Sequence, residues 1–367
     1  MVIRQKFVVI RVNKVNKRIM KIDDFLKQDS EWLKGTGPSS NIVMSSRTRL
    51  ARNLDRMPFS NWANRRQLED AMVAVKDAAL SSNFLKDALF VRLKDTSEVD
   101  RAFLVERHLM SPEHASNVEY KALIVDPKEI VGIMINEEDH LRIQVLQSGL
   151  NIRECWRIID EIDTDLSKKL QFAYSPKWGY LTACPTNTGT GLRTSVMIHL
   201  PALVFAGQIG KVLQAIAKLG LNIRGLYGEG TEATGNVFQV SNQVSMGMTE
   251  EDIVDNIERI MNQIVSREDA TRKAILARNK EALVDRVSRA YGTLKSAHII
   301  TSNETIALLS AIRLGVDAGI VKNMDRRTVN ELFILTQPAH LQKLEGRKLD
   351  QNERDIKRAD LIRERVK

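Results

Sequence analysis

The chain has only two cysteines in 367 residues, Cys155 and Cys184, about thirty positions apart. So few thiols exclude a disulfide framework and favour a reducing compartment, so we expect a cytoplasmic protein. No run of 18 apolar residues occurs, so no membrane-spanning helix is expected. A Gly-x-x-x-x-Gly-Lys-Ser/Thr loop is also missing, which excludes a P-loop nucleotide site.

Acidic residues are missing from positions 1–19, which carry six lysines and arginines. The formal net charge of the whole chain is +9, so the remaining residues carry a net charge of only +3. The basicity is therefore local, and we expect no direct nucleic-acid partner. Residues 1–19 also lack the apolar run and cleavage site of a signal peptide. They are either an extension upstream of a true start at Met20, or a short basic strand or tail.

Three separated stretches repeat one chemical theme. Residues 184–193 place a thiol, a glycine-rich turn and an arginine within ten positions, residues 136–142 combine three carboxylates with an arginine, and residues 224–230 pair arginine with glutamate. Arginines neutralise the oxygens of a phosphoryl group, whereas carboxylates hold a cation such as a guanidinium. The pattern therefore suits transfer of a phosphoryl group to a cationic nucleophile.

The secondary-structure signals predict an α+β fold, in which an antiparallel sheet is flanked by helices. Apolar segments at 130–135 and 141–146 predict a hairpin around the acidic loop, and segments 180–183, 192–200, 223–227 and 236–240 flank the other two loops. Thr249 is a predicted N-cap for a helix with isoleucines at spacings of four and three. From about residue 268 the chain is almost entirely helix-forming, with breaks at Pro338 and Gly346. We therefore predict a catalytic domain at 20–271 and a helical domain at 272–367.

The three stretches resemble those of the guanidino-phosphotransferase (phosphagen kinase) family, and the resemblance runs from about Asn41 to Arg272. It implies that Glu138 and Glu229 grip the guanidinium and that one of them accepts its proton. It also implies that Cys184 orients the guanidinium without forming a covalent intermediate. Judged alone, a cysteine at a strand end is more often a small buried apolar residue.

The resemblance further implies an ATP site built around five arginines. Judged alone, each arginine is more often a solvated surface charge, and only the set of five indicates a site. No set of metal ligands is evident, so Mg²⁺ would be held chiefly by ATP oxygens and water. The implied ATP-binding residues are Ser45, Ser46, Arg47, Thr48, Arg49, His108, Arg142, Arg193, Thr194, Ser195, Val196, Met197, Arg224, Gly225, Leu226, Tyr227, Gly228 and Glu229.

The order of the segments points to a bulky acceptor. Family members that act on small guanidino compounds carry a helical domain before the Ser-x-Arg-x-Arg element, which begins here at Ser45, whereas this chain has a predicted helical domain after it. That order resembles the bacterial protein arginine kinases of the family. This branch implies protein substrates with exposed arginines, a homodimer, and as partners the stress-regulon repressor CtsR, the unfoldase ClpC and the zinc-binding activator McsA.

A charged segment near the C-terminus matches a phosphoarginine-binding motif of the same branch. If it is helical, Arg354 and Arg358 share one face and could clamp a phosphate, although charges of this kind alone more often mark a solvated helix. The implied allosteric site comprises Arg354, Asp355, Ile356, Lys357, Arg358 and Ala359. Two other functions stay open: a free-arginine phosphagen kinase, and a non-catalytic regulator that binds phosphoarginine.

Overall fold

The computed structural model describes residues 20–28, 30–225 and 233–366. The basic segment 1–19 and four of the predicted site residues lie outside this part of the chain. Those four residues are Leu226, Tyr227, Gly228 and Glu229.

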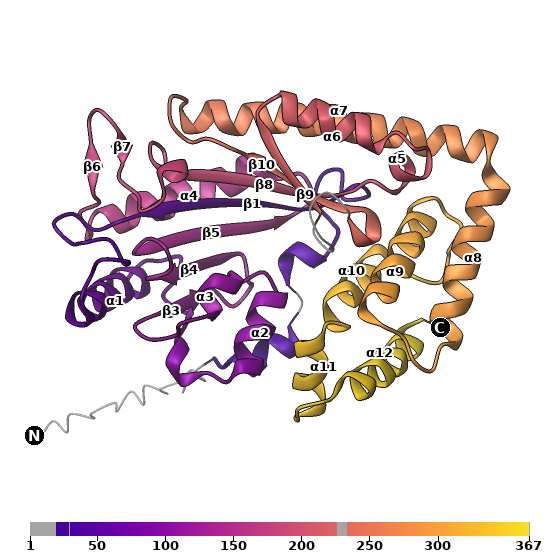
Figure 1. Cartoon of the computed structure of the whole chain (residues 1–367), viewed down its shortest axis with the longest axis horizontal. Helices are drawn as coiled ribbons and strands as arrows, with labels where there is room; N and C mark the ends of the chain where they lie inside the picture. The colour runs from indigo at the N-terminus through magenta and orange to yellow at the C-terminus, as the bar shows by residue number, and fades with distance from the viewer. Residues whose placement is uncertain (1–19, 29, 226–232, 367) are drawn as a thin grey trace, which may run out of the picture.

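An eight-stranded antiparallel sheet forms the centre of the molecule (Figure 1), with the strand order β2-β3-β4-β5-β1-β8-β10-β9. The predicted α+β class and the predicted hairpin between β4 and β5 are confirmed. The strands are β1 (Val43–Arg52), β2 (Leu89–Arg92), β3 (Ala122–Val125), β4 (Val131–Ile135), β5 (Leu141–Ser148), β8 (Leu192–His199), β9 (Leu221–Gly225) and β10 (Val237–Asn242).

The segment before the cysteine loop differs from the prediction, which gave a strand at 180–183 flanking that loop. The structure instead has a separate two-stranded hairpin of β6 (Tyr174–Ser175) and β7 (Gly179–Tyr180). Gly179 has a φ of +74°, and an added Cβ there would lie 2.5 Å from the carbonyl oxygen of Gly189. The chain therefore folds back tightly on the turn at Gly189 and does not extend the main sheet.

Helices cover one face of the sheet and leave part of the other face open. The long helices α4 (Ile152–Ser167) and α7 (Glu250–Arg278) pack on the covered face around the largest apolar core. Thr249 caps α7 as predicted, because its hydroxyl accepts a hydrogen bond from the Asp252 N–H at 3.1 Å. The remaining helices of this part are α1 (Arg65–Leu80), α2 (Glu98–Glu106), α3 (Pro112–Ala115), α5 (Pro201–Phe205) and α6 (Ile209–Lys218).

Short 3₁₀ segments connect these elements. They are η1 (Ile22–Lys27), η2 (Glu31–Leu33), η3 (Leu93–Asp95), η4 (Pro185–Asn187) and η5 (Thr234–Asn236). Among the described helices, none combines the length and the apolar character that a membrane crossing requires.

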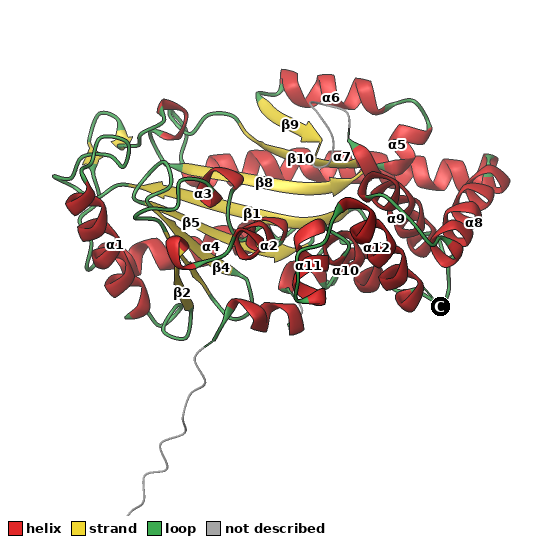
Figure 2. Cartoon of the chain, turned by 60° about the horizontal axis from the view of Figure 1, so that its bottom comes forward, coloured by secondary structure: helices red, strands yellow, loops and turns green. Residues whose placement is uncertain are grey.

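Five further helices gather at one end of the sheet (Figures 1 and 2). The breaks predicted at Pro338 and Gly346 are confirmed, because α11 begins at Pro338 and is followed by Gly346 with a φ of +66°. Helix α7 runs unbroken past the predicted boundary at 271–272 and ends at Arg278. The five helices are α8 (Lys280–Ser296), α9 (Ser302–Asp317), α10 (Arg326–Leu335), α11 (Pro338–Glu345) and α12 (Gln351–Arg365).

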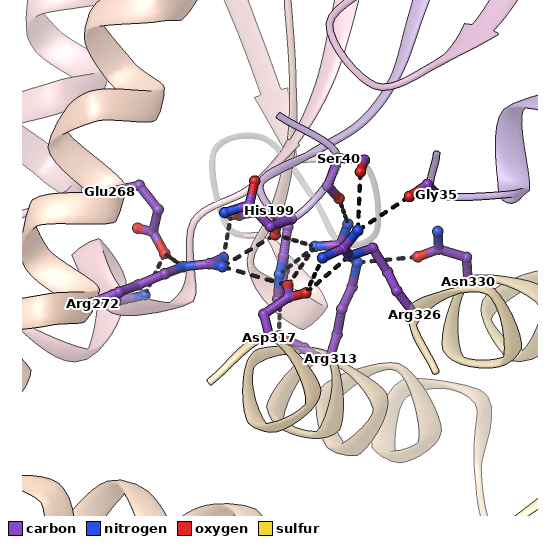
Figure 3. Close-up of polar contacts among 12 residues, drawn as sticks. Gly35, Ser40, His199, Glu268, Arg272, Arg313, Asp317, Arg326 and Asn330 are labelled. Atoms are coloured by element: carbon purple, nitrogen blue, oxygen red, sulfur yellow. Dashed lines mark hydrogen bonds and ion pairs between the residues drawn. The ribbon is translucent and has the colours of Figure 1, made fainter. Parts of the chain in front are cut away.

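A buried polar network joins the helical domain to the ends of β1 and β8 (Figure 3). The Arg313 guanidinium donates to the carbonyl oxygens of Ser40 and Asn41 at 2.7 and 3.0 Å, and it lies 3.1 Å from His199 Nδ1. On the other side of the network, Arg272 donates to Glu268 at 2.8 Å. These contacts fix the chain that enters β1 and the chain that leaves β8, two neighbouring strands of the sheet.

Candidate active site

A cavity of about 690 Å³ opens on the uncovered face of the sheet. It brings together all five predicted arginines, His108 and Glu138, which come from four strands and two loops. The lining residues are Arg47, Arg49, Asn61, Val105, His108, Met110, Ser111, Pro112, Glu113, Lys121, Met134, Glu137, Glu138, Arg142, Gln144, Arg193, Arg224, Gln239 and Ser241.

The cavity lining contains more arginines than carboxylates, so its positive charge is not fully balanced. Arg49 and Arg193 lie directly opposite each other on β1 and β8, an arrangement that like charges disfavour. Burial and the charges of Arg142 and Arg193 lower the pKa of Arg47 to about 10. Burial and the neighbouring arginines also lower the pKa of Arg49 well below its ordinary value. The cluster therefore disfavours its own charge and is suited to a polyanion.

Two guanidinium nitrogens in this cluster have no hydrogen-bond partner within the described residues. Nε of Arg49 and Nε of Arg193 are both buried and unsatisfied. Buried donors of this kind are rare, because each costs free energy until it is paired. A phosphate chain in the cavity would supply oxygen acceptors for them.

One of the five arginines is already paired. Arg142 Nη1 donates to both carboxylate oxygens of Glu137, at 2.5 and 2.6 Å, and the Ser111 hydroxyl donates to Glu137 at 2.6 Å. Burial alone would raise the pKa of Glu137, but the Arg142 charge and these hydrogen bonds hold it below its ordinary value. Glu137 is therefore an ionised structural partner of Arg142.

Glu138 and Cys184 meet at the edge of the same cavity. The Cys184 thiol lies close enough to the Glu138 carboxylate to influence its pKa, and its sulfur lies 3.0 Å from Thr186 Oγ1. Burial, followed by the negative charges of Asp139 and Glu137, raises the pKa of Glu138. A carboxylate with a raised pKa is a stronger base than an ordinary glutamate, which suits proton abstraction.

Asp139 holds the acidic loop and the cysteine loop together. Its Oδ1 accepts hydrogen bonds from Asn53 Nδ2 at 2.6 Å and from the Ala183 N–H at 2.7 Å. Asp139, Asn53 and Glu137 were given no role by sequence reasoning. The acidic run pointed to this region, but the contact between Asn53 and Asp139 spans 86 positions and leaves no local pattern.

Strand alternation divides the predicted nucleotide contacts between the two faces of the sheet. Ser45, Ser195 and Met197 line a smaller recess beside the main cavity, together with Arg47 and His108. The side chains that point toward the helical layer are those of Ser46, Thr48, Thr194 and Val196.

The contacts of these inward-facing residues show why they do not reach the cavity. Ser46 donates to the Gly149 carbonyl oxygen at 2.8 Å, and the Thr48 and Thr194 hydroxyls lie 3.1 Å apart. Only their backbones can face a ligand in the cavity. On β9, Arg224 lines the cavity and Gly225 is the last described residue before the gap.

The charged segment near the C-terminus is helical, as predicted, and lies in α12. Arg358 is 2% exposed and donates to the carbonyl oxygens of Thr336 and Ile300 at 2.8 and 2.9 Å. It also pairs with Asp355. Arg354 is half-buried and makes one long hydrogen bond of 3.4 Å to the Leu349 carbonyl oxygen.

The other members of this segment also contact the surrounding helices. Lys357 pairs with Glu345 at 3.2 Å, Ile356 is half-buried and Ala359 is buried. The Arg358 guanidinium thus binds to its own fold in this structure.

Comparison with known proteins agrees with this geometry. Residues 70–271 match the family described as "ATP:guanido phosphotransferase, C-terminal catalytic domain", and residues 280–367 match the "Protein-arginine kinase McsB C-terminal domain". The "Protein-arginine kinase" of Halothermothrix orenii is 47% identical over 95% of this chain and 99% of its own length. That of Symbiobacterium thermophilum is 48% identical over 93% of this chain and 97% of its own length.

Solved structures agree on the fold. A lombricine kinase structure has a TM-score of 0.56 at 22% identity, covering 68% of this chain and 75% of its own. The duplicated taurocyamine kinase from Schistosoma mansoni has a TM-score of 0.58 at 22% identity, covering 77% of this chain and 43% of its own. Two matched segments, near full-length relatives and the arginine-lined cavity lead to one conclusion: the chain belongs to the guanidino-phosphotransferase family, among the protein-arginine kinases.

Proposed function

We propose that this protein transfers the γ-phosphoryl group of ATP to arginine side chains of protein substrates. The observation that carries the proposal is the convergence of five arginines, two with unsatisfied buried nitrogens, on a cavity that also contains Glu138. The cavity has a cationic part for the nucleotide phosphates and an acidic edge for the guanidinium. Relatives named protein-arginine kinase, similar over nearly the whole chain, support a protein acceptor.

In the nucleotide part, the arginines bind and orient the phosphate chain. Within the described residues, no group of three or more His, Cys, Asp or Glu side chains could hold a metal ion. Mg²⁺ would therefore be held by phosphate oxygens and water, and when bound it neutralises charge that develops on the phosphates. The arginines add fixed positive charge in the same place, which stabilises the transition state without reorganisation.

At the acidic edge, Glu138 receives the guanidinium and takes its proton. A guanidinium with a pKa above about 12 is not nucleophilic at neutral pH, so a base and a fixed orientation are both required. Cys184 lies against Glu138 and orients the same group. Glu229, outside the described residues, is the second carboxylate in this proposal.

A transfer assay separates the three candidate functions. The protein is incubated with labelled ATP, free arginine and an unstructured arginine-rich protein, and acid-labile phosphate is measured in each pool. We expect label in the protein pool. Label only in free arginine supports a phosphagen kinase, and ATP binding without any transfer supports a non-catalytic regulator.

The role of Arg47 is tested by comparing ATP binding in one variant and one control. Arg47→Ala should abolish detectable ATP binding, whereas Arg66→Ala is the matched control because the Arg66 side chain is 92% exposed. Normal ATP binding by Arg47→Ala would refute the assignment of the cavity.

The family resemblance supports further parts of the proposal. These are a cytoplasmic homodimer that marks clients for stress response and proteolysis, with CtsR, ClpC and McsA as partners. Phosphoarginine bound at Arg354 to Ala359 would act as an allosteric ligand. Because Arg358 is occupied by the Thr336 and Ile300 carbonyl oxygens, such a ligand would have to compete with these contacts.

A further inference from the structure

The C-terminal turn of α2 places His108 in the cavity in a strained conformation. The His108 N–H donates to the Val105 carbonyl oxygen at 2.9 Å, and the Leu109 N–H donates to that of Leu104 at 3.0 Å. These two bonds form a Schellman motif, in which glycine normally occupies the left-handed position. Here that position holds His108 with a φ of +60°. A side chain there costs roughly 1–2 kcal/mol, so the surrounding contacts must hold it.

Several residues outside the helical domain hold this turn in place. The His108 ring packs edge-on against Trp32, with ring centroids 5.2 Å apart. The backbone carbonyl oxygen of His108 accepts a hydrogen bond from Gln144 at 3.0 Å. The adjacent Arg107 is buried and donates to Glu129 at 2.9 Å and to Ser30 at 2.6 Å. The imidazole stays neutral, because burial and the nearby charge of Arg47 lower the pKa of His108 to about 3.

The last residue of α2 joins this turn to the helical domain, beside a 3.5 Å contact between Arg107 Nη1 and His340 Nε2. The Glu106 carboxylate accepts hydrogen bonds from the backbone N–H groups of Ala339 and His340 at 2.7 and 2.9 Å. It also accepts one from His340 Nδ1 at 2.7 Å. These N–H groups belong to the first turn of α11, which lies against α2 (Figure 2).

Helix α11 depends on this carboxylate because its own sequence provides no cap. Its N-cap residue, Gln337, makes no side-chain capping hydrogen bond. The first N–H groups of a helix have no intrahelical partner and carry partial positive charge, so an anion there is stabilising. Glu106 supplies that anion from the catalytic domain, and the His340 ring packs 4.5 Å from Phe103 of the same helix, α2.

We propose that Glu106 is a positioning residue, through which α11 of the helical domain holds His108 in the nucleotide part of the cavity. The inference rests on the proposed function, because it takes the cavity to be the ATP site. Glu106 touches no ligand itself. It joins the first turn of α11 to the last turn of α2, two positions before the strained His108. Without this contact, the turn relaxes and ATP binds more weakly.

A contact on α12 extends the connection to the segment with the phosphoarginine motif. Arg358 donates to the carbonyl oxygen of Thr336, which ends α10 one residue before Gln337. A change at Arg358 therefore acts directly on the turn that sets the position of α11. The route from α12 to the nucleotide pocket thus has three steps. They are the Arg358–Thr336 hydrogen bond, the hydrogen bonds of α11 to Glu106, and the hydrogen-bonded turn at His108.

The test is steady-state kinetics on the full-length protein, with ATP and the protein substrate varied separately. Glu106→Gln should raise the KM for ATP about tenfold, the order expected when a charge-assisted hydrogen-bond set is lost. Its kcat and its KM for the protein substrate should stay within about twofold, because the acidic edge is not attached to α2. Glu98→Gln, an 80% exposed glutamate on the same helix, is the matched control and should change neither KM.

A double-mutant cycle asks whether the effect passes through His108. Once His108→Ala has raised the KM for ATP, adding Glu106→Gln should raise it no further. His340→Phe keeps a ring beside Phe103 but removes one of the three hydrogen bonds, so a rise of about twofold to threefold is expected. This variant serves as the probe if Glu106→Gln does not fold.

Two results would overturn the inference: an unchanged KM for ATP in Glu106→Gln despite a lowered melting temperature, or equal effects of Glu106→Gln with and without His108. Arg47→Ala separates this failure from failure of the proposed function. If Arg47→Ala loses ATP binding while Glu106→Gln is normal, only the positioning role is wrong. If Arg47→Ala binds ATP normally, the cavity itself has been misassigned.

Discussion

Replacing Arg313 by methionine should destabilise the protein by about 3 kcal/mol. Arg313 is fully buried, and its loss removes hydrogen bonds to the Ser40 carbonyl oxygen, to Asn330 Oδ1 and to His199 Nδ1 (Figure 3). Each buried acceptor that loses its partner costs about 1–3 kcal/mol. Asp317 keeps its contact with Arg326 at 2.7 Å, so no buried carboxylate is left unpaired.

Two effects reduce the sum of those costs. Burial lowers the pKa of Arg313 to about 9, which means that burying its charge already opposes folding, and the methionine variant regains part of that free energy. The methionine side chain also fills most of the space of the arginine stem. The net loss of about 3 kcal/mol lies at the lower end of the range for breaking a buried ion pair. For a chain of 367 residues it corresponds to a melting temperature lowered by roughly 4 °C.

Thermal melting followed by circular dichroism measures this loss. Arg327→Met is the matched control, because that arginine is 45% exposed and forms an i,i+4 pair with Glu331 on the same domain. It should cost less than about 0.5 kcal/mol. If Arg313→Met melts within 1 °C of the control, the buried network does not contribute to the union of the two domains.

Four further outcomes are expected. Glu138→Gln should lose about 10²–10⁴-fold in transfer rate and keep its ATP affinity, since general-base catalysis is lost; turnover close to wild type in single-turnover assays contradicts this role. Cys184→Ala should reduce the rate less, and isolation of a phosphocysteine would show a covalent role instead. Arg354→Ala combined with Arg358→Ala should remove activation by added phosphoarginine, an effect of about 5–150-fold in affinity, and an unchanged titration curve argues for a purely structural helix. The buried His108 stays neutral in the fold and binds a proton only when the protein unfolds. Lowering the pH below its unfolded pKa of about 6.5 therefore favours the unfolded state. About 1.4 kcal/mol of unfolding free energy should be lost by pH 5.5, and His108→Gln should show a shallower pH dependence in urea titrations.

The parts of the fold that could be predicted from sequence are those set by local periodicity and end signals. The β4–β5 hairpin follows from alternation on both sides of a polar loop, and α7 follows from an N-cap threonine and an isoleucine stripe. The C-terminal breaks follow from Pro338 and Gly346. The β6–β7 hairpin was missed because its reason is the close approach of Gly179 to Gly189, which no local pattern records.

The sequence locates the candidate site but does not show which side chains lie on which face of the sheet. A run such as Ser45 to Arg49 reads as one contact set, although strand geometry sends alternate side chains to opposite sides of the sheet. Arg358 reads as an exposed clamp by its helical spacing, but its burial depends on carbonyl oxygens 22 and 58 positions away. Contacts of this range are set by tertiary packing.

The helical domain and the sheet share a hydrophobic core, which bears on how the domain division should be understood. Met44, Leu146 and Met197 come from β1, β5 and β8, and they pack in one buried cluster with residues of α8, α9, α10 and α12. The same three strands carry Arg47, Arg142 and Arg193 toward the cavity. Because close-packed cores transmit displacement, the strands cannot shift independently of these helices. The helical domain is therefore part of the support of the proposed nucleotide site, through this shared core, through the network at Arg313 and through the contact of α11 with Glu106.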